Sequence, residues 1–337
     1  MRRPIAVVVL GLSFGACGSS DDPVGDPQTF DFGPFALSAG QEINNQCVSA
    51  TLGNDAPIYV SAVELTTGTG FHHSNWFTVP DTMFDGPDGT WRCAERGYDE
   101  AIAGIAGGVL FAQSTQATHE VQQFPPGVAI VIPAHSRIVA GTHLLNTGDD
   151  ALSVDLALKI TPVAKPPTLL SAMSFTNQSI TLPPHRKSRM TMECDINTAF
   201  HAREGRDADF KFYYALAHYH ELGTGLTVEA LRPDGTASTI YETTHRIGDA
   251  LGGAIDAFSM TGFDKLRFSC DFDNPRDTAV RWGVGDQEMC TFLAFTDSDW
   301  TWGGGALMFD ETPTIVDHGD VVEYTYPCDV ISSEPIR

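Results

Sequence analysis

The stretch Leu152-Ser153-Val154-Asp155-Leu156-Ala157-Leu158 alternates larger apolar residues with small or polar ones at a strict period of two. Successive side chains of a β-strand point to opposite faces, so this pattern is typical of a strand with one buried face. Residues 57–65 and 128–132 form similar apolar runs. Turn-forming residues such as those at 85–89 and 146–150 separate such runs. The first half of the chain is therefore predicted to be β-structure.

The second half repeats this style. Residues 227–231 lead into Arg232-Pro233-Asp234-Gly235-Thr236, which predicts a hairpin. Between the halves, residues 161–167 end in two adjacent prolines that cannot donate to a ladder, so this segment is the predicted linker. We expect an all-β protein of two tandem antiparallel β-sandwich, jelly-roll-like domains at 29–162 and 168–330. Residues 98–113, rich in Ala and Gly, are predicted to be a short helix or a loop.

The composition is that of a folded globular protein. Of the 337 residues, 42% are hydrophobic, and 32 glycines and 20 prolines indicate many turns. The net charge of −23 argues against nucleic acids and anionic membrane surfaces as partners. At this length, two domains are expected rather than one.

Residues 1–17 are predicted to direct export. Arg2-Arg3 precede a short apolar core at 5–12, and Phe14-Gly15-Ala16-Cys17 resembles a bacterial lipoprotein cleavage site. Cleavage there makes Cys17 the lipidated N-terminus, with residues 18–28 as a flexible tether. The alternative is ordinary secretion with cleavage nearby. In either case we expect the mature protein outside the cytoplasm, in the cell envelope or secreted, with membrane contact only through a lipid anchor.

Six cysteines remain once Cys17 is set aside, and an even number in an exported chain predicts three disulfides. Cys47 and Cys93 lie in the first predicted domain and are expected to pair. The other four lie in the second domain and allow three pairings; they are Cys194, Cys270, Cys290 and Cys328.

The motif His218-Tyr219-His220 places two imidazoles at positions i and i+2, which share one face of a strand. This arrangement predicts a two-nitrogen platform for a transition metal. Met289 is a candidate third ligand, because thioethers bind Cu(I) well and zinc poorly. The alternative for a lone methionine is packing in the core.

The pair His72-His73 is geometrically different, since adjacent strand residues point to opposite faces. Both can serve one ion only at a β-bulge or through different ring nitrogens. The alternative is one buried and one solvated histidine. His143, in the same predicted domain, is a possible third imidazole.

In this order, these motifs resemble those of the copper type II, ascorbate-dependent monooxygenases, the family of peptidylglycine α-hydroxylating and dopamine β-monooxygenases. The resemblance spans residues 30–330. It is carried by His72-His73, His143 after residues 124–128, His218-x-His220-x-x-Gly223 and Glu288-Met289-Cys290.

The resemblance implies two copper ions flanking a cleft between the domains. His72, His73 and His143 would hold the electron-transfer copper. His218, His220 and Met289 would hold the catalytic, oxygen-binding copper. The family pattern also implies the disulfides Cys47–Cys93, Cys270–Cys290 and Cys194–Cys328.

The reaction that the resemblance implies is hydroxylation of a C–H bond with dioxygen, with ascorbate as the reductant. Three positions depart from the peptide-hydroxylating members: Leu216 replaces an arginine, Leu293 a tyrosine and Gly141 a glutamine. We therefore expect an apolar pocket wall and a small organic substrate other than a peptide glycine. One alternative is an exported two-copper binding or electron-transfer protein without hydroxylase activity. Another is a zinc hydrolase in which Met289 is not a ligand.

Overall fold

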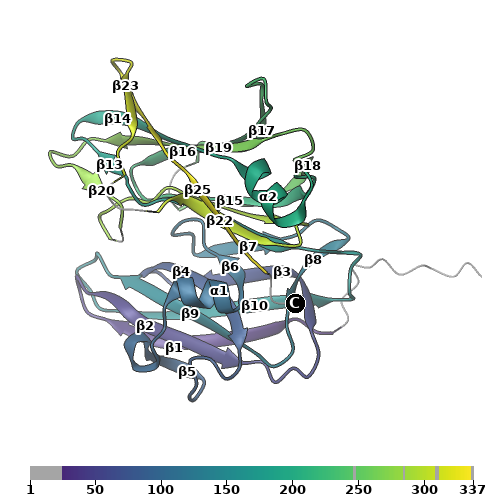
Figure 1. Cartoon of the computed structure of the whole chain (residues 1–337). Helices are drawn as coiled ribbons and strands as arrows, with labels where there is room; N and C mark the ends of the chain where they lie inside the picture. The colour runs from purple at the N-terminus through teal and green to yellow at the C-terminus, as the bar shows by residue number, and fades with distance from the viewer. Residues whose placement is uncertain (1–24, 246–247, 284, 308–310, 335–337) are drawn as a thin grey trace, which may run out of the picture.

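The structure is a computed structural model that describes residues 25–245, 248–283, 285–307 and 311–334. Strands dominate it, and helices are few and short (Figure 1). The prediction of an all-β fold is confirmed. The alternating stretch that begins at Leu152 forms the first part of β10, where Val154, Leu156 and Leu158 are buried.

Residues up to Leu169 form two sheets. In sheet 1 the strand order is β1-β10-β3-β8-β11, with β7 paired to β3. Its strands are β1 (Gln28–Leu37), β3 (Ile58–Thr67), β7 (His119–Gln123), β8 (Val128–Ile132), β10 (Leu152–Val163) and β11 (Thr168–Leu169). In sheet 2 the order is β5-β2-β9-β4-β6. Its strands are β2 (Glu42–Thr51), β4 (Phe71–Pro80), β5 (Gly89–Arg92), β6 (Gly108–Ala112) and β9 (Ser136–Leu145).

The remaining residues form two larger sheets and a small one. In sheet 3 the order is β18-β15-β21-β12-β22-β25. Its strands are β12 (Ser171–Asn177), β15 (Lys211–His218), β18 (Gly252–Ser259), β21 (Thr291–Thr296), β22 (Thr301–Ala306) and β25 (Asp329–Ser333). In sheet 4 the order is β17-β16-β19-β14-β24-β23. Its strands are β14 (Arg186–Cys194), β16 (Gly223–Leu231), β17 (Ala237–Thr243), β19 (Lys265–Asn274), β23 (Thr314–Asp317) and β24 (Val321–Tyr326), while β13 (Thr181–Leu182) pairs with β20 (Val280–Arg281).

The segment between the halves differs from its prediction in two respects. The strand β10 continues through Pro162, which lies opposite Val60. The β10–β3 register shifts at this residue, so the pairing of the two strands continues past the first proline. Thr168 and Leu169 then form β11, which pairs in parallel with β8 of sheet 1. The sheets of the second half therefore begin at Ser171, a few residues later than predicted.

The halves, stacked in Figure 1, share one apolar core. Alternate residues of β15 point to opposite sides of sheet 3. Ala215 and Ala217 pack between sheets 3 and 4, whereas Tyr214 and Leu216 join the core of the first half. Phe124 of the first half contacts Tyr214, with ring centroids 5.7 Å apart. The contact between the halves is thus built like a protein interior.

The structure contains the three disulfides that the resemblance implied, Cys47–Cys93, Cys194–Cys328 and Cys270–Cys290. Disulfides persist in oxidising compartments, so the protein is an exported one. Cys17 lies outside the described residues. Within the described part of the chain, no helix is long and apolar enough to span a membrane.

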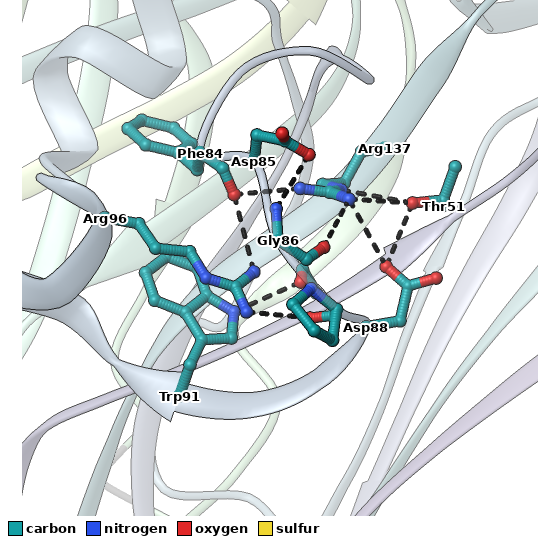
Figure 2. Close-up of polar contacts among 10 residues, drawn as sticks. Thr51, Phe84, Asp85, Gly86, Asp88, Trp91, Arg96 and Arg137 are labelled. Carbon is teal, nitrogen blue, oxygen red and sulfur yellow. Dashed lines mark hydrogen bonds and ion pairs between the residues drawn. The ribbon is translucent and has the colours of Figure 1, made fainter.

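Two arginines hold the segment that covers the outer face of sheet 2 (Figure 2). Arg137, 4% exposed, donates to the carbonyl oxygens of Phe84 and Gly86 at 2.8 and 2.9 Å. Arg96 donates to Pro87 O and lies 4.4 Å from the Trp91 ring centroid. Since Arg137 is committed to protein oxygens, this network is structural. The helix α1 (Glu100–Ala106) and the 3₁₀ helix η1 (Cys93–Arg96) lie in the same region, and α2 (Ile196–Glu204) lies in the second half.

Candidate metal centre between the halves

A β-bulge brings His72 and His73 of β4 to the same site. In the β4–β9 ladder, Phe71 pairs with Leu144 and His73 with His143, so His72 is the extra residue at the register shift. A bulge of this kind is what the adjacent pair needed if both imidazoles were to serve one site. The His72 ring centroid lies 4.4 Å from that of His143.

His218 is the last residue of β15, and His220 lies in the turn that follows. Their ring centroids are 5.2 Å apart, as expected for side chains that share a face. Between them, Tyr219 points into the core and is fully buried. Gly223 is required here, because a Cβ at this position would lie 2.1 Å from Cδ2 of Tyr219.

All five histidines meet where the halves touch. His73 lies 4.5 Å from His218, and His72 lies 6.0 Å from His220, measured between ring centroids. The sequence predicted two ligand sets on opposite sides of a cleft. In the structure the imidazoles of the two sets are neighbours, because the halves are packed together at this point.

Backbone carbonyls fix the tautomers of the second-half histidines. Nδ1 of His218 donates to Ser114 O at 2.8 Å, and Nδ1 of His220 donates to Gln287 O at 2.7 Å. A carbonyl oxygen can only accept, so Nδ1 carries the proton and Nε2 keeps a lone pair. Nε2 of His218 is buried and has no hydrogen-bond partner. In both residues Nε2 therefore has the free lone pair that a metal ligand needs.

Two of the first-half histidines, His72 and His143, are held through Nε2. Nε2 of His143 lies 2.7 Å from Oε1 of Glu42, and Nε2 of His72 lies 2.5 Å from the Gln116 amide. Nδ1 of His72 is buried without a hydrogen-bond partner. A half-turn of the Gln116 amide would let its oxygen accept a proton from His72 Nε2, which would leave a lone pair on Nδ1.

Burial lowers the pKa of four of the histidines. Burial, followed by the neighbouring imidazoles, lowers the pKa of His72 and of His218 to about 3. The same causes lower the pKa of His73 well below its ordinary value, and burial lowers that of His220. At neutral pH these four side chains are uncharged, which is the form that binds metal ions.

Met289 lies beside the His218–His220 turn because Glu288 ties the two segments together. The Glu288 carboxylate, 1% exposed, accepts the backbone N–H of His220 at 2.9 Å and of Leu222 at 2.7 Å. It also accepts from the N–H of Met289, and the next residue is the disulfide cysteine Cys290. Met289 is therefore half-buried on a segment anchored at both sides.

Five residues at this site were given no role by the sequence analysis. Glu42 and Gln116 contact first-half histidines, Ser114 orients His218, Gln287 orients His220, and Glu288 holds the His220 backbone. Only Glu288 had a sequence signal, as the neighbour of Met289. The others are distant in sequence from the imidazoles they contact, so no local spacing marks them.

The donor chemistry fits a transition metal, although no ready-made cage is present. Within the described residues, no three His, Cys, Asp or Glu side chains are arranged to hold an ion as they stand. The unpartnered buried atoms His72 Nδ1 and His218 Nε2 are costly unless something binds them. Imidazole nitrogens suit copper, and so does a thioether such as that of Met289, whose backbone N–H bonds to Glu288.

The residues expected to line an apolar substrate wall lie elsewhere. Leu216 and Leu293 are 1% and 6% exposed and pack in the shared core, so that expectation is wrong. A Cβ on Gly141 would lie 3.2 Å from the Tyr98 ring, whose hydroxyl accepts the Gly141 N–H at 3.1 Å. Tyr98 thus occupies the space that a longer side chain at 141 would need.

Comparisons with known proteins identify no family. No protein-family model matches the chain, and no curated protein matches it. Among solved structures, the major capsid protein P2 from bacteriophage PM2 is 8% identical with a TM-score of 0.31, covering 81% of this chain and 97% of that one. A peptide-N(4)-(N-acetyl-β-D-glucosaminyl) asparagine amidase is 10% identical with a TM-score of 0.30, covering 80% and 96%. Such remote likeness carries no information about activity.

Proposed function

We propose that this protein is an exported copper-dependent monooxygenase that hydroxylates a C–H bond of a small organic substrate. Dioxygen and a reductant such as ascorbate would be co-substrates. The observation that carries the proposal is the meeting of five histidines from both halves, with a buried, unpartnered Nε2 on His218 and with Met289 on an adjoining segment. Bound copper would supply one-electron redox chemistry and a binding place for dioxygen.

The residues of the chain have separable tasks in this proposal. His218 and His220 present Nε2, because Ser114 O and Gln287 O hold their Nδ1 protons. Met289 would add a soft sulfur donor that favours Cu(I). Burial of the imidazoles keeps bulk water away from them.

We also propose that Cys17 carries a lipid that anchors the protein in the bacterial cell envelope. Support comes only from the sequence of residues 1–17, with its basic start, apolar core and small residues before the cysteine. Incorporation of labelled fatty acid into the wild-type chain, and none into Cys17→Ser, is the expected result. Equal labelling of both chains would contradict the anchor.

The proposed activity predicts ascorbate-dependent oxygen uptake by the copper-loaded protein with a panel of small organic substrates. Uptake is expected to need both copper and substrate, and mass spectrometry should detect one added oxygen atom per product molecule. His218→Ala should abolish uptake, while His119→Ala, at an exposed histidine, should not. Bound copper that cycles between oxidation states without any product would contradict the hydroxylase.

That last outcome describes the second candidate, a two-copper binding or electron-transfer protein. One observation favours it. The positions where the resemblance places substrate-gripping groups, Leu216 and Leu293, are buried in the shared core. Product analysis separates the two candidates, since both bind copper.

Replacing Met289 with Ile distinguishes copper from zinc. If the thioether is a ligand, Met289→Ile should weaken Cu(I) binding by about tenfold or more and abolish oxygen uptake, while Zn²⁺ affinity stays unchanged. Competition with a chromophoric Cu(I) chelator measures the first effect. Met173→Ile, at a fully buried methionine of the core, is the matched control and should bind Cu(I) normally. Unchanged Cu(I) affinity in Met289→Ile would remove Met289 from the site.

A further inference from the structure

We propose that His73, although it belongs to the first half, is a ligand of the metal site of the second half, together with His218 and His220. This inference rests on the proposed metal-binding function but concerns how ligands are divided between the ions. It departs from the division that the motif order suggests, in which His73 joins His72 and His143.

The ring positions support this division. The His73 ring centroid lies 4.5 Å from that of His218, and the His218 ring lies 5.2 Å from that of His220. His72 instead lies 4.4 Å from His143. The closest neighbours of the two adjacent histidines are therefore on different halves of the protein.

The bulge in β4 explains how adjacent residues reach different partners. His72 is the inserted residue at the register shift, so its side chain leaves the strand outside the regular alternation. Its Nε2 is held by Gln116. His143, opposite His73 in the ladder, is held through Nε2 by Glu42. Gln116 and Glu42 thus hold His72 and His143 as one pair.

The His73 group is also within reach of a common ion. Bonds from imidazole nitrogen to a bound metal are about 2.0–2.1 Å, so two nitrogens on one ion lie no more than about 4 Å apart. The three rings do not yet surround one point, so side chains whose ring centroids are 4.5 and 5.2 Å apart must reorient for their nitrogens to meet that condition. His218 Nε2 has no competing hydrogen bond to lose.

A shared ligand has a functional consequence. With His73 included, the second-half site has three imidazoles before any sulfur is counted, and it is complete only when the halves are packed together. The first-half site is left with two imidazoles, those of His72 and His143. Metal binding at the second-half site would then stabilise the contact between the halves.

The test removes the first-half pair and then asks whether His73 still matters. In the double variant His72→Ala/His143→Ala, we expect one Cu(II) per chain, with three imidazoles in its pulsed-EPR spectrum. Adding His73→Ala should reduce this number to two and weaken copper affinity by about 10- to 100-fold. Adding His119→Ala instead, at a side chain that is 58% exposed, should change neither quantity.

When the second-half pair is removed instead of the first-half pair, we expect His73 to have no effect on copper binding. In His218→Ala/His220→Ala, adding His73→Ala should leave the affinity and the imidazole count of the remaining copper unchanged. Gln substitutions at the same positions, with circular dichroism, show whether lost binding reflects lost folding. The inference is overturned if His73→Ala acts only in this reciprocal background, or if neither folded background binds copper separately. Failure of wild-type protein to bind copper at all would instead overturn the proposed function.

Discussion

Acidifying the metal-free protein from pH 4.5 to pH 3 is expected to destabilise it. Burial lowers the pKa of His72 and His218 to about 3, whereas both ionise near 6.5 in the unfolded chain. Between these values the unfolded state binds more protons, so the free energy of unfolding falls as the pH falls. Each histidine removes about 1.4 kcal/mol per pH unit in this window. The two histidines together remove about 2.7 kcal/mol per pH unit.

Buried carboxyls oppose this effect over part of the range. Burial raises the pKa of Glu100, Glu120 and Glu288 to about 7, from 4.5, so between these pH values each carboxyl gains about as much stability per pH unit as one histidine loses. These groups bind protons more tightly in the folded state, so their contribution grows as the pH falls from 7 to 4.5 and then stays constant. Below about pH 4.5 the histidines act without this opposition. The steepest loss of stability is therefore expected there.

Urea unfolding followed by tryptophan fluorescence at a series of pH values measures the effect. His72→Phe removes one of the responsible groups and should make the acid limb shallower. His318→Phe, at a side chain that is 58% exposed, should not. Zn²⁺ should move the acid transition to lower pH, because bound metal must be displaced by protons. A free energy of unfolding that stays constant between pH 4.5 and 3 would contradict the assigned burial.

Replacing Glu288 with Ala is expected to cost about 3–5 kcal/mol of stability and to weaken copper binding. The Glu288 carboxylate accepts the buried N–H groups of His220 and Leu222, at 2.9 and 2.7 Å. Each would lose its acceptor, at about 1–3 kcal/mol per buried group, and the Met289 N–H would lose its bond as well. The turn that carries His220 would then be free to move relative to Met289.

Glu221→Ala provides the control for this experiment. Glu221 is the next residue after His220, but its side chain is 75% exposed and pairs with Arg276 at the surface. Its replacement should change stability by less than about 1 kcal/mol and leave copper binding intact. Glu288→Gln should fall between the two, because its amide oxygen can still accept while its NH₂ faces other donors. Equal stability of Glu288→Ala and wild type would show that the N–H groups find other acceptors.

The sequence predicted those features of the fold that repeat locally. Period-two alternation placed the strand that begins at Leu152, and the Pro-Asp-Gly turn after Leu231 placed a hairpin that the β16–β17 ladder contains. The i, i+2 spacing placed His218 and His220 on one side. Residue types and their spacing were sufficient to predict these features, because each depends on only a few neighbouring residues.

Features that depend on contacts between distant segments were not predictable in this way. No local pattern shows that Ser114 would reach His218, or that Glu42 would reach His143, over about a hundred residues. Leu216 and Leu293 illustrate the same limit. An apolar residue beside a ligand has the same sequence signature whether it lines a pocket or fills a core, and here sheet 3 is buried on both faces.

The packing of Phe124 against Tyr214 and Phe295 restricts how far the two halves can move apart. Swinging one half away from the other would expose these rings and the leucines beside them to water, at about 25 cal/mol for each Å² of apolar surface. Opening is therefore a rare event coupled to partial loss of the core, rather than a hinge motion of independent bodies. Metal ions that arrive after folding must enter at the edge of the contact between the halves. We therefore expect bound metal to exchange slowly with metal in solution.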